Sequence, residues 1–272
     1  MKTLFRREFG HPKLMIGMVH TPPLPGAPGY DRAGGMRPVV ERALADAGTL
    51  QDAGFHAVMF SNEFDMPYEM TMRRETIAAM TAVVMEARPQ LRVPYGVNML
   101  IDPAASVAIA HATGARFVRA YLTGAFAGDF GLWQGRGAEV QRLKAAIGAR
   151  VLVIANATPG FSDSLDRRSL AAIAYGAVVN GLADAVCVSG SIAGVPTDPA
   201  SLRVAAEAVP DTPVVAGTGV TEENVGRLLR CCDGVIIGTW LKVDGDIRNP
   251  VDPGRARRFM AAVAAHTTVD AG

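Results

Sequence analysis

The feature that most constrains this chain is an alternation, repeated eight times, of a short apolar run, a turn and a helix pattern. The apolar runs are continuous rather than interrupted by polar residues, which is typical of parallel strands buried on both faces. Strands that alternate with helices in this way predict a parallel sheet with the helices outside it. The predicted strands are residues 14–19, 57–60, 94–97, 117–121, 151–155, 185–188, 214–216 and 235–237.

A closed barrel and an open, doubly wound sheet both fit this pattern. The open sheet would normally carry a Gly-x-Gly-x-x-Gly turn after its first strand, but here that strand runs into His20 and TPPLPGAPGY. A barrel of eight strand–helix units typically needs about 250 residues, and the chain has 272. We therefore predict an α/β fold, a single (β/α)8 TIM barrel over residues 1–272, with 1–12 as an N-terminal extension and 267–272 as a flexible tail. The helices are predicted at residues 38–53, 71–87, 104–113, 138–147, 168–179, 199–208, from 221 onward, and 253–265.

Charge and composition exclude several classes of function. Lys plus Arg number 27 and Asp plus Glu number 26, so the net charge is +1 and there is no broad positive field for nucleic acid. No uncharged apolar run approaches the about 18 residues of a membrane span, and His, Pro and Lys at positions 11–13 interrupt any signal-peptide core. Three cysteines without paired spacing suit a reducing compartment. We predict a cytoplasmic protein with no nucleic-acid partner and no transmembrane segment, and leave homo-oligomerisation open.

The segment 213–242, PVVAGTGVTEENVGRLLRCCDGVIIGTWLK, contains the last two predicted strands, and each runs straight into glycine. Gly217 and Gly219 follow the first of these strands, and Gly238 follows the second. Small side chains let a ligand reach backbone N–H groups, and a helix opened by Thr221 would add its N-terminal dipole. Barrels of this type often bind phosphate after strands 7 and 8. We predict a phosphate site here; the alternative is that the glycines only permit tight turns.

Chemistry in a βα barrel gathers at the carboxyl ends of the strands, and polar residues follow nearly every predicted strand. Glu63 and Asp65 are the acid–base candidates, because two neighbouring carboxylates raise the pKa of one of them. His20 could act as a general base, bind a metal or simply form hydrogen bonds, and Arg119 offers a guanidinium fork for a carboxylate or phosphate. The predicted ligand- and phosphate-binding residues are Asn98, Asn156, Ser189, Gly190, Gly217, Thr218, Gly219, Gly238 and Thr239.

Two further regions leave alternatives open. Lys242 could form a Schiff base, but it lies four residues beyond Gly238 and is expected to be exposed. The long segment 122–137 is either a lid whose Trp133 covers the ligand or a static loop with Trp133 packed on the barrel. The five histidines show none of the usual metal-binding spacings, so we predict no cofactor; the alternative is a divalent ion held by His20 with Glu63 and Asp65.

Seven motifs spread over nearly the whole chain are IGMVHTPPLPGAPGY, PYGVNML, GARFVRA, ADAVCVSGSIAG, VVAGTGVTEENV, DGVIIGTWLKVDG and NPVD. Together they resemble the BtpA family, also called BtpA/SgcQ. That family is similar to ribulose-phosphate-binding barrels, so the resemblance implies phosphate held after strands 7 and 8, at Gly217, Gly219, Gly238 and Thr239. Family members are named for a role in photosystem I biogenesis, and relatives sit beside sugar-metabolism proteins.

The chain departs from the family pattern at three strand ends. Residues 100–102 are Leu-Ile-Asp instead of Arg-Asn-Asp, residues 119–121 are Arg-Ala-Tyr instead of Arg-Val-Asn, and residues 151–157 lack the usual Lys and His. The phosphate-binding positions are kept while the reacting centre differs. One hypothesis is an isomerase, epimerase or lyase that acts on a small phosphorylated metabolite through an enediolate. The other is a non-catalytic accessory or ligand-sensing barrel, such as a biogenesis factor for a membrane or photosystem complex.

Overall fold

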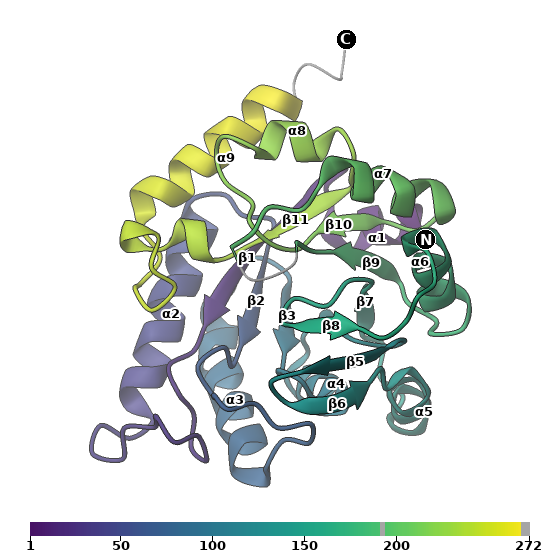
Figure 1. The fold of residues 1–272 in the computed structure, drawn as a ribbon. Coiled ribbons are helices and arrows are strands. Elements are labelled where there is room, and N and C mark those ends of the chain that lie inside the picture. The colour runs from purple at the N-terminus through teal and green to yellow at the C-terminus, as the bar shows by residue number, and fades with distance from the viewer. Residues whose placement is uncertain (191–193, 268–272) are drawn as a thin grey trace.

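The computed structural model describes residues 1–190 and 194–267, and its eight parallel strands close into a barrel (Figure 1). Around the barrel the strands follow the order β1-β11-β10-β9-β7-β4-β3-β2. Their bounds are β1 Leu14–His20, β2 Ala57–Ser61, β3 Tyr95–Asn98, β4 Phe117–Ala120, β7 Leu152–Asn156, β9 Ala185–Val188, β10 Val214–Ala216 and β11 Gly234–Ile237. The predicted TIM barrel is confirmed, and every predicted strand boundary lies within one residue of the observed one. Residues 268–272 of the predicted tail lie outside the described residues.

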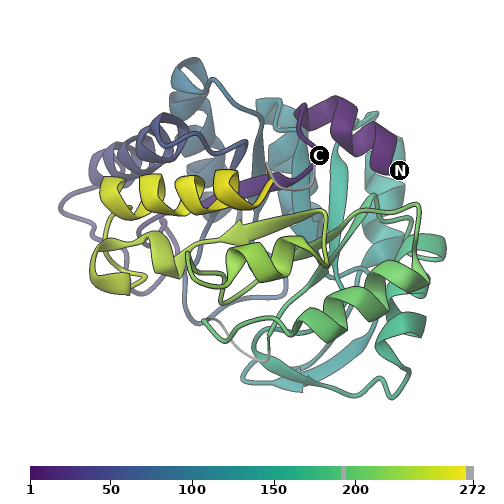
Figure 2. The same cartoon turned by 90° about the horizontal axis from the view of Figure 1, so that it is seen from above.

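Helices form a layer outside the strands (Figure 2). Their bounds are α2 Arg37–Asp52, α3 Arg74–Ala87, α4 Pro103–Thr113, α5 Gly137–Ile147, α6 Leu170–Val179, α7 Pro199–Ala208, α8 Val225–Leu229 and α9 Pro253–Thr267. Asp102, Ser169 and Asp198 cap α4, α6 and α7, because their side chains accept backbone N–H groups of the first helical turn. Within residues 1–190 and 194–267, no helix combines the length and the apolar character needed to cross a bilayer.

The helix between the last two strands is shorter than predicted. Thr221 does not cap it: α8 begins after Asn224 and has five residues. The Asn224 Oδ1 accepts the Thr221 backbone N–H at 2.9 Å, which folds residues 221–224 into a turn ahead of the helix. The prediction that Thr221 is the N-cap of this helix is therefore wrong.

The predicted N-terminal extension contains a helix, α1 (Lys2–Phe9), which closes the amino-terminal end of the barrel. Its Phe5 and Phe9 are buried, and the Phe9 ring centroid lies 5.5 Å from that of Phe117 inside the barrel. Gly10 ends the helix in a left-handed conformation, with its N–H bonded to the Arg6 carbonyl. Aromatic packing thus fills one end of the barrel, and the open mouth is at the carboxyl ends of the strands.

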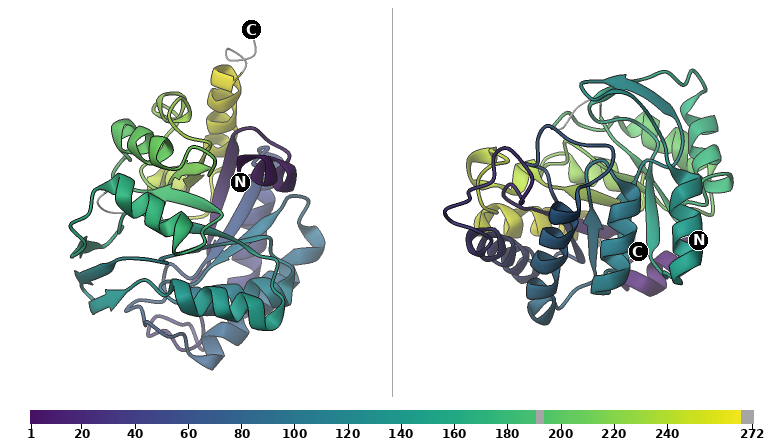
Figure 3. Two further views of the ribbon diagram at one scale, coloured as in Figure 1. Left: turned by 90° about the vertical axis from the view of Figure 1, so that its right-hand side faces the viewer. Right: turned by 90° about the horizontal axis from the view of Figure 1, so that it is seen from below.

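Residues 122–137, predicted as a long loop, contain an antiparallel hairpin. β5 (Ala125–Gly128) pairs with β6 (Gly131–Gln134) on one side and with β8 (Ser162–Ser164) on the other. Gly131 has φ of 79°, a conformation that tight hairpin turns require and that glycine adopts without strain. This three-stranded sheet is separate from the barrel sheet (Figure 3).

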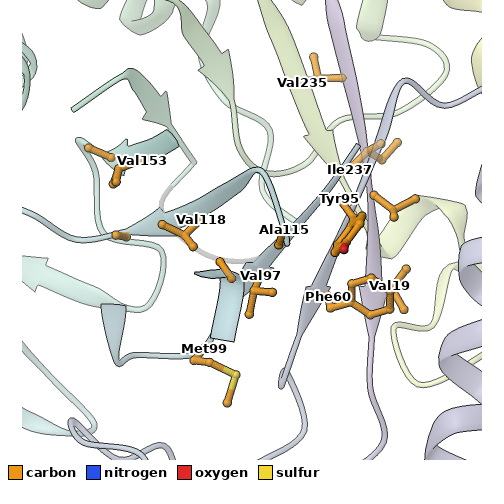
Figure 4. Close-up of a cluster of buried hydrophobic side chains, with 14 of the residues drawn as sticks. Val19, Phe60, Tyr95, Val97, Met99, Ala115, Val118, Val153, Val235 and Ile237 are labelled. Carbon is orange, nitrogen blue, oxygen red and sulfur yellow. The ribbon is translucent and has the colours of Figure 1, made fainter. Parts of the chain in front are cut away.

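Buried side chains along each strand alternate between the barrel interior and the layer under the helices. In β1, Leu14, Ile16 and Met18 pack in the interior, whereas Met15 and Val19 pack with residues of the helices. This period of two decides which strand-end residues point into the mouth. Figure 4 shows part of the outer cluster, with Val19, Phe60, Val97, Val118, Val153, Val235 and Ile237 among the labelled residues.

Candidate functional site

The carboxyl ends of the strands enclose a cavity of about 260 Å³. The predicted site residues that line it are His20, Glu63, Asn98, Arg119, Asn156, Gly217, Thr218, Gly219, Gly238 and Thr239. The predicted residues Asp65, Ser189 and Gly190 are not part of its wall. Most of the sequence-derived candidates are therefore brought together around one mouth.

The polar lining continues the inward-facing series of the strands. In β4 the buried Phe117 in the barrel interior is followed, two residues on, by Arg119 in the cavity wall. In β7 the interior residue Ile154 is followed in the same way by Asn156. An apolar plug therefore lies directly beneath a polar layer, and it holds that layer in a site shielded from water on its lower side.

Arg119 is held across the cavity by two neutral partners. Its Nε donates to Asn156 Oδ1 at 2.8 Å, and its Nη2 donates to Ser189 Oγ at 3.0 Å. Gly217 makes room for this arrangement, because a Cβ there would lie 3.1 Å from Arg119 Nη2 and 2.5 Å from Cys187 Sγ. Since neither hydrogen bond goes to a carboxylate, these two partners do not neutralise the positive charge of the guanidinium.

His20 and Glu63 face each other, with His20 Nε2 and Glu63 Oε2 4.0 Å apart. Burial lowers the pKa of His20 well below its usual value, and the charges of Lys242 and Arg42 lower it further. Burial raises the pKa of Glu63, while the charge of Arg119 opposes that rise. The site therefore pairs an imidazole that is neutral at pH 7 with a carboxyl group whose pKa is shifted toward neutrality.

Gly238 gives His20 its place in the wall. A Cβ on Gly238 would lie 2.7 Å from His20 Cε1, a distance that real side chains do not tolerate. His20 is 4% exposed, and its Nδ1 has no hydrogen-bond partner among the described residues. A buried polar atom of this kind is normally satisfied, so His20 Nδ1 retains bonding capacity for a water or a ligand.

Asp65 does not join Glu63. The Asp65 Oδ1 accepts the Leu24 backbone N–H at 2.7 Å, and its Oδ2 accepts the Asn62 Nδ2 at 3.1 Å. Burial raises the pKa of Asp65, and these two hydrogen bonds oppose the rise. Both oxygens thus anchor the loop after β1, and the predicted carboxylate pair in one cleft is wrong because the turn from Asn62 to Asp65 sends the second carboxylate elsewhere.

The glycine turns contribute fewer free N–H groups than the sequence suggested. The Gly217 N–H donates to the Val188 carbonyl at 2.8 Å, and the Gly190 N–H donates to Thr218 Oγ1 at 2.6 Å. Gly219 has φ of 61° and packs so tightly on Pro196 that no Cβ fits there. The backbone that remains as a candidate phosphate cup is that of Gly219, Gly238 and Thr239, which line the cavity.

Lys242 is buried, contrary to prediction. Its side chain is 0% exposed, and its Nζ lies 2.6 Å from Oδ2 of Asp46 on α2, which is 1% exposed. The chain turns back after Lys242, so that Val251 donates its N–H to the other oxygen of Asp46 at 2.8 Å. Burial lowers the pKa of Lys242, and Asp46 opposes the shift. Lys242 is absent from the cavity wall and anchors the segment after β11 to α2.

An aromatic wall that sequence reasoning missed borders the cavity. Tyr121 and Phe161 line it together with Leu100. Trp133 stands behind this wall rather than in it: its ring centroid lies 4.9 Å from that of Tyr121, and its Nε1 donates to Ser162 Oγ at 3.0 Å. The sequence indicates this wall only through Tyr121, which lies two residues after Arg119 and is therefore expected to point inward as Arg119 does.

Among the described residues, no three His, Cys, Asp or Glu side chains gather closely enough to hold a metal ion.

Comparison with known proteins gives a consistent picture. The model of the BtpA family matches residues 11–265. The chain is 44% identical to the protein SgcQ of the sgc region of Escherichia coli (strain K12), over 95% of this chain and 97% of the relative. It is 33% identical to the photosystem I biogenesis protein BtpA of Synechocystis sp. (strain PCC 6803), over 92% of this chain and 88% of the relative.

Solved structures support the same fold at low sequence identity. Orotidine 5′-phosphate decarboxylase from Pyrococcus horikoshii superposes with a TM-score of 0.58 at 11% identity, covering 92% of this chain and 99% of that one. Phosphoribosyl anthranilate isomerase from Thermus thermophilus gives a TM-score of 0.56 at 12% identity, covering 93% and 98%. At such identities the likeness concerns the barrel alone.

Proposed function

The chain belongs to the BtpA family, and we propose that it is an enzyme that moves a proton on a small phosphorylated metabolite, in an isomerisation, epimerisation or aldol-type cleavage of a sugar phosphate. The observation that carries the proposal is the facing pair of His20 and Glu63, 4.0 Å apart beside Arg119 in the cavity wall. A neutral imidazole and a carboxyl group with a raised pKa are suited to proton transfer near pH 7.

Each of the three side chains has a distinct part in the proposed reaction. The Glu63 carboxylate removes a proton from the carbon beside the substrate carbonyl, the electron pair of that C–H bond forms the enediolate, and in an isomerisation Glu63 returns the proton to the former carbonyl carbon. Arg119 stabilises the negative charge that develops on the carbonyl oxygen. It can do so because its two hydrogen-bond partners, Asn156 and Ser189, are neutral. Neutral His20 offers a hydrogen bond to the same intermediate and passes the proton between oxygens.

The phosphate of the substrate belongs at the turns after β10 and β11. The backbone of Gly219, Gly238 and Thr239 lines the cavity there, and hydrogen bonds to a charged partner contribute about 1.5–3 kcal/mol each. This position is on the same cavity as the His20 and Glu63 pair, so a ligand anchored by its phosphate reaches the proton-transfer groups.

Deuterium exchange tests the chemistry. Phosphorylated aldoses and ketoses, with ribose 5-phosphate and ribulose 5-phosphate first, are incubated with the protein in D2O and followed by NMR. We expect deuterium to enter the carbon beside the carbonyl, and the Glu63→Gln variant to slow this by at least about 100-fold, because a positioned base contributes that much. Glu69→Gln is the matched control, since Glu69 lies outside this cavity, half-exposed and paired with Arg73.

Thermal shift tests the phosphate position independently. Thr239→Glu places a carboxylate at the proposed cup, where it repels a phosphate dianion. A ligand at about 100 times its Kd stabilises the fold by about 2.7 kcal/mol, and this gain should disappear in Thr239→Glu while it persists in Glu69→Gln. A substitution at Gly219 is unsuitable, because its added Cβ would collide with the backbone of Pro196. An unaltered response in Thr239→Glu would place the phosphate elsewhere.

A second candidate is ligand binding without chemistry. It is favoured by the relative of 33% identity that is named for photosystem I biogenesis. Under this alternative the wild-type protein is stabilised by phosphorylated compounds but exchanges no deuterium into any of them. The two experiments together therefore separate the two functions.

A further inference from the structure

Part of the aromatic wall lies across the barrel mouth from the candidate phosphate cup, and Phe161, in the loop after β7, lies between the two. In the closed order of eight strands, β4 is four positions from β11, and β3 is four positions from β10. Tyr121 directly follows β4, and Leu100 follows β3, whereas Gly219 follows β10 and Gly238 follows β11. All of them line the same cavity, so a ligand that fills it reaches from the cup to the wall.

The wall is rigid. The Tyr121 hydroxyl accepts the Gly160 N–H at 3.3 Å, and the Tyr121 ring centroid lies 6.1 Å from that of Phe161. Behind them Phe126 and Trp133 are buried, with ring centroids 4.2 Å apart. A preformed aromatic surface favours a flat apolar partner and offers little to sugar hydroxyls.

The middle of the cavity is polar in contrast. Asn98, Arg119 and Asn156 line it together with the His20 and Glu63 pair. Amide and guanidinium groups are suited to hydroxyl and carbonyl oxygens. The cavity thus offers an anion cup with Trp240 beside it, a polar middle, and the aromatic wall of Tyr121 and Phe161.

We propose that the ligand of this cavity is a sugar phosphate that also carries a planar ring, with the ring against Tyr121 and Phe161 and the phosphate at the turns after β10 and β11. This inference rests on the phosphate position of the proposed function and names a narrower substrate class: a sugar phosphate whose ring is attached so that the sugar can still open to a carbonyl or imine, as in a glycosylamine. Nucleotides have no such carbonyl, so in the experiment below they report binding of the ring and not turnover.

Isothermal titration calorimetry tests the proposal with ribose 5-phosphate, uridine 5′-monophosphate, adenosine 5′-monophosphate and uridine as probes. Stacking of a base on an aromatic side chain increases affinity by about tenfold or more. We expect at least one of the two nucleotides to bind about tenfold more tightly than ribose 5-phosphate, and uridine to bind far more weakly than either nucleotide. If ribose 5-phosphate binds as tightly as both nucleotides, the ring site is refuted while the phosphate site stands. If no phosphorylated probe binds, the phosphate position itself fails, and this inference falls with it.

Two variants locate the ring. Phe161→Leu keeps an apolar side chain but removes the aromatic face, and it should reduce the ratio of nucleotide affinity to ribose 5-phosphate affinity by about tenfold. Phe130→Leu is the matched control, because Phe130 packs on Phe161 with centroids 5.4 Å apart but does not line the cavity. Melting curves establish that both variants are folded. Equal affinity ratios in the two variants would overturn the assignment of the ring to this wall.

Discussion

The buried ion pair between Lys242 and Asp46 should be an essential support of the loop that follows β11. In Lys242→Met the Asp46 carboxylate, which is 1% exposed in the wild type, stays buried. Among the described residues it then keeps the Val251 N–H at 2.8 Å and the Arg42 Nε at 3.3 Å. Removing one partner of a buried pair typically costs about 3–5 kcal/mol. Because Arg42 remains close to Asp46, we expect a loss near the lower end, about 3 kcal/mol.

The measurement is urea unfolding followed by far-ultraviolet circular dichroism, with melting curves as a second readout. For a chain of this size, a loss of about 3 kcal/mol lowers Tm by about 6–12 °C. Arg73→Met is the control, since the side chains of Arg73 and of its partner Glu69 are 61% and 44% exposed, and an exposed pair of this kind contributes little to stability. A cost for Lys242→Met as small as that of the control would refute the reasoning.

A double variant distinguishes two causes of the loss of stability: the unpaired charge of Asp46 and the poorer packing of methionine at position 242. Asp46→Asn in the Lys242→Met background removes the uncompensated carboxylate and keeps an oxygen that can accept the Val251 N–H. We expect it to recover more than half of the lost free energy of unfolding, since neutral replacements of a buried pair are often tolerated. If the double variant is no more stable than Lys242→Met, the cost comes from packing of the methionine rather than from the charge of Asp46.

Three further outcomes are expected. Burial is the main cause that lowers the pKa of His56 to about 4 in the folded protein, so protonation of His56 favours the unfolded chain. The free energy of unfolding should therefore be highest above about pH 6.5 and fall as the pH drops from there toward 4. In urea titrations, His56→Gln should make the free energy of unfolding less dependent on pH over this range. Gly217→Ala should displace Arg119 and thereby weaken the binding of a phosphorylated ligand in thermal-shift assays. Gly48→Ala is the control, because no atom lies within 4 Å of its added carbon, and it should leave binding intact. Equal effects of the two variants would contradict the inference that Gly217 makes room for Arg119. The raised pKa of Glu63 predicts that kcat/KM rises with pH through a value above 4.5, as measured in the deuterium-exchange assay, and an acid limb at or below 4.5 would exclude Glu63 as the base.

The sequence predicted the barrel well because its signals are local. Eight apolar runs of a few residues each, with helix patterns between them, locate the strands to within one residue. The same strands also predict that His20, Arg119 and Asn156 point into the barrel mouth. Each lies two positions after an interior residue of its strand, and side chains along a strand alternate between the two faces.

Other features of the site depend on residues that are distant in sequence. Lys242 was expected in solvent, but its partner Asp46 precedes it by 196 residues and meets it only when the barrel closes. The hairpin of β5 and β6 escaped prediction because its short, glycine-rich strands carry little intrinsic β preference, and β8 completes the sheet from a distant part of the chain.

The sequence alone determined the fold class, the family and most of the residues around the mouth, because hydrophobic pattern and strand parity are properties of short segments. Only the tertiary structure decided what those residues do for each other. It paired Glu63 with His20 rather than with Asp65, and it turned Gly217 and Gly238 into the spaces that Arg119 and His20 fill. These outcomes depend on which atoms of different strands come within a few ångströms of each other, and closure of the barrel fixes that in three dimensions.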